Sequence, residues 1–310
     1  MNAADFSAFC PAPKRAEVIE VCPRDGFQNV KAFIPTATKI AILDDLAEAG
    51  FKTIEVTSFV SPKAIPQMAD AAEVLTEFRR KHVGIEAVAL VPNVKGAEKA
   101  IANGAHTLNF VLSASESHNR ENTRRTVDES LTELAEVCHL TGASHVHASV
   151  ATAFTCPFEG DVPKDAVIKL VDKIIALGCK GVSLADTIGT ASPRKVYGTL
   201  RAVKERFPQA RVVLHLHDTQ GMALANIMTA MSLGYNIFDA AAGGLGGCPF
   251  APGAAGNVAT EDLLNFLTAL GVETDVDAGK VLNAAMKLPK LTGVPLCSHM
   301  AALTMCKTGA

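Results

Sequence analysis

The sequence predicts a closed (β/α)8 barrel, the TIM-barrel class of α/β folds, with extra C-terminal helices. The main observation is that short β-branched runs alternate with longer runs of helical periodicity, and that this unit recurs eight times along the 310-residue chain. Strands separated by helices pair in parallel through right-handed crossovers, and eight such units match a barrel. The alternative is an open, doubly wound sheet. Against it, no G-x-G-x-x-G motif follows the first strand, where a dinucleotide-binding sheet carries one.

The first four units cover the N-terminal half of the barrel. In the first helix, Ile40, Leu43, Leu46 and Ala47 recur at helical spacing, and Gly50 suits the C-cap. The expected strands are 18–21, 53–59, 85–91 and 107–112, and the expected helices are 36–50, 66–80, 95–103 and 127–141. The polar residues 113–125 are expected to form a loop before the fourth helix.

The last four units follow the same pattern. The expected strands are 146–153, 181–185, 211–216 and 237–241, with helices at 164–177, 193–207 and 223–233 and a helix start after Asn257. We expect a tail over 1–16, a barrel domain over 17–271 and a helical extension over 272–310. The extension is expected to pack across one end of the barrel or against a second subunit.

Composition excludes several classes of partner. The net charge is only -3, and the chain has no tryptophan and no block of lysine and arginine, so nucleic acid is not an expected partner. No window approaches the roughly 18 apolar residues of a membrane span. The eight cysteines are scattered, which favours reduced thiols and a cytoplasmic location over a disulfide framework. The chain is expected to form a homo-oligomer, a dimer or higher.

Candidate catalytic residues gather where the barrel rule places an active site, at the C-terminal ends of the strands. Polar side chains follow or end the first, sixth, seventh and eighth strands, and one lies within the second; they are Arg24, Asp25, Glu55, Asp186, His215, His217, Cys248 and Asn257.

A divalent-cation site is the first prediction from this set. His215 and His217 are two apart on a strand, so both imidazoles project to the same, inward face. Barrel closure brings Asp25 and Asn257 to the same place, and this mixed set suits Mg²⁺ or Mn²⁺ better than a structural zinc. The alternative is a pair of buried structural histidines. A second H-x-H, at 145–147, opens a strand and is expected at the opposite face in a structural role.

The other candidates each have a structural and a catalytic interpretation. Arg24 either forms an ion pair with Asp25 or stabilises negative charge on a carbonyl oxygen. Glu55 and Asp186 either hold loops or support catalysis. Cys248 either packs as a small apolar residue or, with glycines on both sides, is exposed on a mobile loop where it can transfer a proton.

The motifs resemble those of the 3-hydroxy-3-methylglutaryl-CoA lyase family, metal-dependent TIM-barrel lyases and aldolases, from about residue 14 to 270. The shared motifs are E-V-C-P-R-D-G-F-Q-N at 20–29, I-E-V-T-S-F-V-S-P-K at 54–63, L-A-D-T-I-G at 184–189, H-L-H-D-T at 215–219 and the glycine-rich stretch 242–262. R-D-G-x-Q and H-x-H-D also occur in related synthases and aldolases, whereas the cysteine loop is more specific to the lyases.

The resemblance implies roles for individual residues. Asp25, His215, His217 and Asn257 match the metal ligands, Arg24 the residue that stabilises the enolate, and Cys248 the proton-transferring cysteine. Glu55 and Asp186 match catalytic acidic residues, and Gln28 and Lys31 are expected near the acyl-CoA substrate. The implied reaction is a retro-Claisen-type cleavage of 3-hydroxy-3-methylglutaryl-CoA to acetyl-CoA and acetoacetate.

Some positions depart from the family pattern. Cys22 and Leu216 replace residues that are common there, and the segment 113–126 carries three arginines. These arginines are either solvated surface or contacts to CoA phosphates or a substrate carboxylate. The alternatives left open are therefore a lyase for another branched 3-hydroxyacyl-CoA, a synthase that condenses acetyl-CoA or an aldolase on the same metal site, and a barrel that only binds an acyl-CoA.

Overall fold

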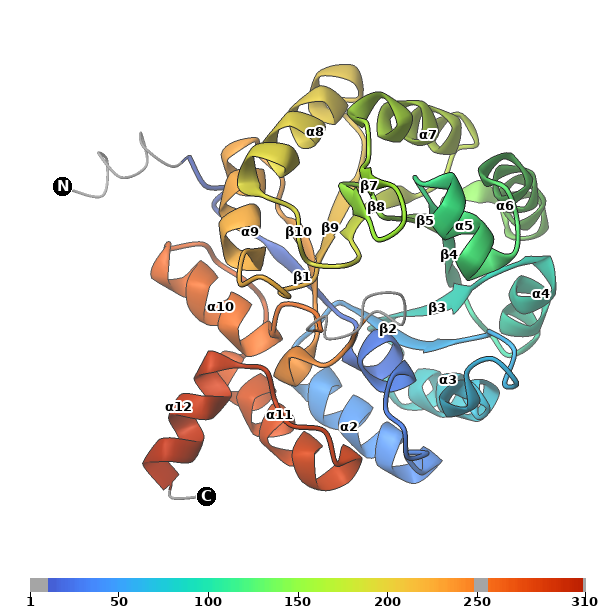
Figure 1. The fold of residues 1–310 in the computed structure, drawn as a ribbon. Coiled ribbons are helices and arrows are strands. Elements are labelled where there is room, and N and C mark those ends of the chain that lie inside the picture. Colours follow the sequence, from blue (N-terminus) through green and yellow to red (C-terminus); the bar gives the residue numbers. More distant parts are fainter. Residues whose placement is uncertain (1–10, 248–255, 309–310) are drawn as a thin grey trace.

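The computed structural model describes residues 11–247 and 256–308, which form a closed barrel of eight parallel strands surrounded by helices (Figure 1). The barrel strands are β1 Glu17–Glu20, β2 Thr53–Ser58, β3 Glu86–Val91, β4 Thr107–Ser113, β5 Val146–Ala151, β8 Gly181–Asp186, β9 Val212–Leu216 and β10 Ile237–Ala240. Their order is β1-β10-β9-β8-β5-β4-β3-β2, so β10 lies between β1 and β9. The predicted TIM-barrel class is confirmed.

The helices that the sequence predicts are all present between or after the strands. These helices are α2 Thr36–Glu48, α3 Ala71–Lys81, α4 Val94–Ala102, α6 Val127–Thr141, α7 Lys164–Ala176, α8 Pro193–Arg206, α9 Ala223–Ser232 and α10 Thr260–Ala269. The segment predicted as one helix over 66–80 is divided into a 3-10 turn, η2 Pro66–Met68, and α3. Two further short turns are η3 Ala143–His145 and η4 Ala242–Gly244.

The prediction of a plain loop over 113–125 is wrong, because α5, Glu116–Thr123, lies within it. The Ser115 side chain caps this helix by accepting a hydrogen bond from the N–H of His118. The buried residues of α5 are His118 and Asn119, which are both polar, so the helix lacks the apolar stripe that makes a helix visible in a sequence. A two-stranded hairpin, β6 Thr155–Cys156 and β7 Gly160–Asp161, also adds to the top of the barrel after β5.

The C-terminal extension lies on the flank of the barrel and touches its C-terminal end where Cys297 N–H donates to Gly243 O at 2.9 Å. Its first helix, α11 Ala278–Thr292, runs antiparallel to α2 on the flank, and the second is α12 His299–Thr308 (Figure 1). The N–H of Asp277 donates to Ala49 O at the end of α2, and Lys287 pairs with Asp45 one turn earlier. The outer layer of helices therefore continues from α10 through α11 to α2.

The lower interior of the barrel is polar. A cavity of about 40 Å³ is lined by residues that include Glu55, Asn109, His147, Ser149 and Asp239. The lining also includes charged side chains that are paired: Arg211 pairs with Glu17 at 2.9 Å, and Lys180 pairs with Glu86. Because the cavity exceeds the volume of one water molecule and its walls offer several polar partners, it can hold ordered water.

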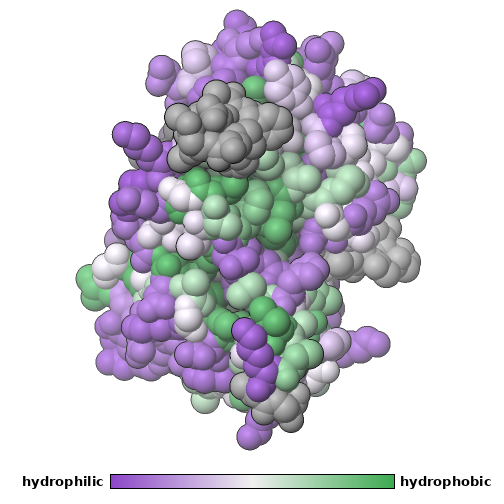
Figure 2. All heavy atoms as spheres, turned by 90° about the vertical axis from the view of Figure 1, so that its left-hand side faces the viewer, coloured by the Kyte–Doolittle hydropathy of each residue, from purple (hydrophilic) through white to green (hydrophobic). Residues whose placement is uncertain are grey.

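Within the described residues no helix has both the length and the apolar character that crossing a bilayer requires. Figure 2 shows the flank that carries α9, α10 and α12, where apolar patches lie between polar side chains. Leu303 of α12 is one of the exposed large apolar side chains.

Candidate metal centre

Arg24 and Asp25 lie in a short π-helical turn, η1 Cys22–Gly26, that directly follows β1. The N–H groups of Arg24 and Asp25 both donate to Val21 O, at 3.1 and 2.7 Å, so the carbonyl between the strand and the turn holds the turn. Turns of this type recur at functional sites. Both side chains are buried at the C-terminal end of the barrel, where the sequence places them.

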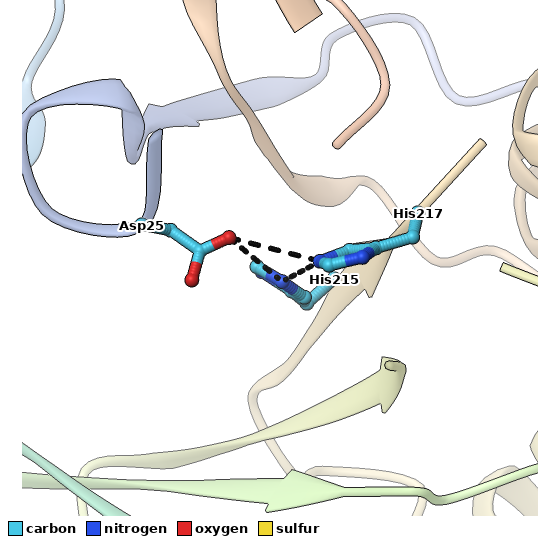
Figure 3. Close-up of side chains that lie close together, drawn as sticks. All are labelled: Asp25, His215 and His217. Carbon is cyan, nitrogen blue, oxygen red and sulfur yellow. Dashed lines mark hydrogen bonds and ion pairs between the residues drawn. The ribbon is translucent and has the colours of Figure 1, made fainter. Parts of the chain in front are cut away.

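The two imidazoles come from β9 and the residue after it. The Asp25 carboxylate points toward both rings (Figure 3). Asp25 Oδ2 lies 3.9 Å from His215 Nε2 and 3.7 Å from His217 Nε2, and the two Nε2 atoms are 3.2 Å apart. Ligand atoms lie about 2.1 Å from Mg²⁺, so two ligands of one ion are at most about 4.2 Å apart, and all three separations satisfy this limit. Among the described residues, these three form the group that can hold a metal ion.

Asn257 joins this group through the backbone that follows the glycine-rich stretch. It pairs with His217 in an antiparallel bridge, and Val258 N–H donates to Leu216 O at 3.0 Å. Its Nδ2 donates to Asp25 Oδ2 at 2.6 Å, while its Oδ1 is buried and has no hydrogen-bond partner among the described residues. A half-turn of the amide exchanges the two atoms and brings the oxygen beside Asp25, at the place that Nδ2 occupies. A cation would satisfy this oxygen, so the residues fit a divalent ion.

Two glycines allow the chain to approach the cluster. Gly246 has φ +138°, and a Cβ at this position would lie 2.6 Å from Asn257 Nδ2 and 3.2 Å from Asp25 Oδ2. A Cβ at Gly256 would lie 2.2 Å from Gly244 O. A side chain at Gly246 would therefore displace Asp25 or Asn257, and one at Gly256 would push this residue away from Gly244. Cys248, the predicted proton donor, lies outside the described residues.

The Arg24 guanidinium is held between two carboxylates. Its Nε donates to Glu55 Oε2 at 2.6 Å, and its Nη1 pairs with Asp25. The charge of Asp239 also acts on it. Three carboxylates around one guanidinium leave a charge of -2 when both imidazoles are neutral, from -3 and +1. A divalent cation would balance this charge.

The two carboxylates that pair with Arg24 respond differently to burial. Burial opposes the charge on Asp25, but Arg24, a hydrogen bond with His217 and the charges of both imidazoles outweigh it and hold the pKa of Asp25 well below its usual value. Burial raises the pKa of Glu55 despite the opposing effects of Arg24 and Asn109. Burial would lower the pKa of His215, but Asp239 and Asp25 raise it above the usual value.

The remaining predicted residues surround the cluster at different distances. Gln28 Nε2 donates to Asp25 Oδ1 at 3.0 Å, so Gln28 contacts a candidate metal ligand. Asp186 ends β8 and accepts from the N–H groups of Thr190 and Ala191, at 3.3 and 3.0 Å, which holds the following loop. Its carboxylate also interacts electrostatically with His217, and burial raises its pKa. Lys31 is exposed in the loop after η1.

The structure adds polar residues that the sequence reasoning did not identify. Asn109 Nδ2 donates to Glu55 Oε1 at 2.7 Å, and Ser149 donates to Asn109 Oδ1 at 2.8 Å, so Glu55 is held from below. Asp239 contacts His215 Nδ1 at 3.0 Å. These residues alternate with apolar neighbours along β4, β5 and β10, and this alternation is the signal that marks an inward position.

The second H-x-H and the arginines lie away from this cluster. His145 is exposed in η3, and His147 lines the lower cavity, where burial lowers its pKa to about 4. Arg120 pairs with Glu116 at 3.0 Å and Arg125 with Glu133 at 2.6 Å. Arg124 is exposed, with Glu121 at 3.7 Å.

Comparisons with known proteins identify the family of the chain. The family model described as HMGL-like matches residues 15–287. The chain is 43% identical over 291 residues to a hydroxymethylglutaryl-CoA lyase of Bacillus subtilis, covering 93% of this chain and 97% of that protein. It is 43% identical over 286 residues to the mitochondrial hydroxymethylglutaryl-CoA lyase of Rattus norvegicus, covering 92% and 88%. A solved HMG-CoA lyase from Acinetobacter baumannii, in complex with coenzyme A and 3-methylmalate, is 42% identical with a TM-score of 0.89, covering 93% of this chain and 95% of that chain.

Proposed function

The chain belongs to the HMGL-like family, and from this we propose that it is a divalent-metal-dependent carbon–carbon lyase that cleaves 3-hydroxy-3-methylglutaryl-CoA to acetyl-CoA and acetoacetate. The observation that carries the proposal is the buried Asp25–His215–His217 group at the C-terminal end of the barrel, with Arg24 beside it. A relative that binds coenzyme A supports a CoA thioester as the substrate.

Asp25, His215, His217 and Asn257 are the residues that would hold Mg²⁺ or Mn²⁺. Two imidazoles, a carboxylate and an amide oxygen form a mixed N/O donor set that leaves coordination positions for substrate oxygens. When bound, such a cation lowers the pKa of the substrate hydroxyl and orients the substrate oxygens. Gln28 supports this set, because it donates to Asp25 Oδ1.

We assign to Arg24 the stabilisation of the negative charge that develops on the substrate during cleavage. As a base takes the hydroxyl proton, the hydroxyl oxygen becomes the keto group of acetoacetate, the carbon–carbon bond breaks and its electron pair becomes the thioester enolate. A guanidinium has five N–H donors, so its bonds to Glu55 and Asp25 leave donors for the enolate oxygen. Because Glu55 is itself held by Asn109, Arg24 needs little reorganisation when the charge appears.

We assign Cys248 as the donor of the proton that converts the enolate carbon to the methyl group of acetyl-CoA. Two observations support this role. Gly246 lies against Asp25 and Asn257, and Asn29 Nδ2 donates to Gly247 O at 3.4 Å, so the chain enters the cysteine segment beside the metal group. A thiol in this place can deliver a proton to carbon directly or through a neighbour.

Glu55 and Asp186 receive supporting roles in this proposal. Glu55 orients Arg24, and Asp186 holds the loop after β8 while its charge acts on His217. Lys31, exposed in the loop after η1, is proposed to contact the CoA moiety.

The test is a substrate panel on the purified enzyme. The protein is stripped with a chelator, reloaded with Mg²⁺ or Mn²⁺ and offered 3-hydroxy-3-methylglutaryl-CoA and other branched 3-hydroxyacyl-CoA thioesters, with acetyl-CoA and acetoacetate measured separately. Release of both products from 3-hydroxy-3-methylglutaryl-CoA supports the proposal. Release of acetyl-CoA only from a different thioester would show that this thioester, and not 3-hydroxy-3-methylglutaryl-CoA, is the substrate. Consumption of acetyl-CoA with a keto acid, without cleavage, would instead identify a synthase.

A homo-oligomer is part of the proposal. The apolar patches on the flank of α9, α10 and α12, and the exposed Leu303, support self-association (Figure 2). Sedimentation velocity is expected to show a dimer or a larger species, and a monomer at micromolar concentration would contradict it.

A further inference from the structure

Asp239 makes a contact that none of the roles above uses. It lies on β10, next to β9, and its Cα pairs in register with that of His215. Asp239 Oδ2 lies 3.0 Å from His215 Nδ1. The opposite ring nitrogen, Nε2, faces Asp25 Oδ2 at 3.9 Å and His217 Nε2 at 3.2 Å. The His215 ring therefore lies between the Asp239 carboxylate on one side and Asp25 and His217 on the other.

This geometry favours one tautomer of the neutral His215 imidazole. A neutral imidazole carries its proton on one nitrogen and its lone pair on the other, and only the nitrogen with the lone pair can bind a cation. A carboxylate beside Nδ1 accepts a hydrogen bond from that nitrogen, so the proton resides on Nδ1. The lone pair is then on Nε2, which is the atom that faces Asp25 and His217.

His217 lacks such a partner. Its Nδ1 is buried and has no hydrogen-bond partner in the part of the chain that the structure describes. The two imidazoles of the H-x-H pair are thus unequal, because only the ring of His215 is oriented by a carboxylate.

The surroundings of Asp239 explain how a second carboxylate can lie beside His215, which Asp25 also faces. Asp239 lines the polar cavity in the lower barrel, where water can hydrate its carboxylate. The charge of Arg24 also attracts it.

We propose that Asp239 is a positioning residue, which holds His215 as the Nδ1–H tautomer and so aims the Nε2 lone pair at the divalent cation. The inference rests on the metal site of the proposed function, but not on the identity of the substrate. Loss of a carboxylate that orients a ligating histidine typically weakens metal binding about 10- to 100-fold.

The test uses metal binding without substrate. Asp239→Ala and Asp239→Asn are compared with the wild type and with Ser183→Ala, a control in the barrel interior. Ser183 is buried, and its Oγ has no partner among the described residues, so the control removes a buried oxygen without touching a ligand. Mn²⁺ affinity is measured by isothermal titration calorimetry and folding by thermal melting. The expected result is a 10- to 100-fold weaker affinity for Asp239→Ala, a smaller loss for Asp239→Asn and no change for Ser183→Ala.

Long-range ¹H–¹⁵N spectra of the metal-free protein give a second readout, with His215 assigned from its absence in His215→Gln. The spectra are recorded at alkaline pH, where the ring is neutral; the wild type is expected to show Nδ1–H, and Asp239→Ala a mixture of tautomers. A folded Asp239→Ala protein that binds Mn²⁺ within twofold of the wild type, or that keeps the Nδ1–H tautomer, would overturn the inference. If Asp239→Ala fails to fold, Asp239→Leu, which is similar in shape to aspartate and has no hydrogen-bond acceptor, carries the test. A wild type that binds Mn²⁺ but cleaves no thioester refutes the proposed function and leaves this inference standing.

Discussion

Glu20 is the residue whose replacement tests the electrostatics of this barrel most directly. Its side chain is 0% exposed at the end of β1. Its Oε1 accepts from the N–H groups of Cys22 at 2.8 Å and Ala242 at 3.0 Å, and its Oε2 accepts from Thr260 Oγ1 at 2.8 Å. Burial outweighs these hydrogen bonds and raises the pKa of Glu20 from 4.5 to about 8, with the nearby Glu261 acting in the same direction.

The sign of the effect follows from where the proton is bound. Below pH 4.5 Glu20 is protonated in both the folded and the unfolded state, and its contribution to stability is complete. Between pH 4.5 and about 8 the unfolded chain releases the proton and the folded protein keeps it, so the contribution falls with rising pH until it is lost through the folded pKa. The slope is about 1–2 kcal/mol per pH unit.

Glu20→Gln removes this dependence and keeps the shape of the side chain. The amide oxygen can accept from Cys22 and Ala242, and the amide NH₂ can donate to Thr260 Oγ1, in place of the bonds that Glu20 makes. We therefore expect the variant to gain stability relative to the wild type as the pH rises, on the order of 4 kcal/mol between pH 5 and 8.

The assay is urea unfolding of both proteins at pH 5, 6, 7 and 8, with Glu98→Gln as a control. Glu98 is exposed, so its replacement removes a carboxylate without changing the buried set. The free energy of unfolding of Glu20→Gln minus that of the wild type must increase with pH, whatever this difference is at pH 5. Parallel stability curves for the two proteins would show that Glu20 is ionised at neutral pH and would refute the reasoning.

Four further experiments address the metal group and the chemistry. His217→Ala is expected to weaken Mn²⁺ binding at least tenfold by calorimetry, because it removes one of three closely spaced candidate ligands; unchanged affinity would exclude it as a ligand. Arg24→Lys is expected to lower kcat about 100-fold in the acetoacetate assay, since an ammonium cannot reproduce the planar fork between Glu55 and Asp25, and a wild-type kcat would contradict this. Cys248→Ala is expected to lower kcat about 100- to 10,000-fold with unchanged Mn²⁺ affinity, so a rate equal to wild type would remove its assigned role. Chelation of divalent cations is expected to abolish cleavage and re-addition of Mn²⁺ to restore it; a metal-stripped protein that still cleaves would refute the metal requirement.

The order of the barrel elements could be predicted because its signals are local. The helix over 127–141 has the same bounds in the sequence prediction and in the structure, since a Thr126–Glu129 capping box and an apolar stripe both mark it. Helix α5 escaped prediction because Asn119 is buried through hydrogen bonds, donating to Arg125 O, Thr126 O and Ser130 Oγ. A polar buried face gives no hydrophobic period, so only the three-dimensional contacts reveal it.

Like the fold, the candidate site could be predicted from the sequence only in part. Asp25, His215 and His217 could be predicted to meet because two of them share a strand face and the third ends a strand near it. Asp239 could not be assigned a partner from the sequence. Its inward direction follows from the alternation with Phe238 and Ala240, but its contact with His215 depends on the register between β10 and β9, which the sequence does not state.

The polar interior of the barrel and the metal group depend on one another through Arg24. A buried guanidinium is stable only with paired charges, and Glu55 and Asp25 supply them at the C-terminal end of the strands. Each of these carboxylates needs support in turn, which Asn109 gives to Glu55 and Gln28 gives to Asp25. Because every member is held by a neighbour, the donors of Arg24 keep their direction before any substrate arrives. This fixed direction is what stabilisation of an enolate oxygen requires, since a donor that had to reorient during bond cleavage would lose most of its effect.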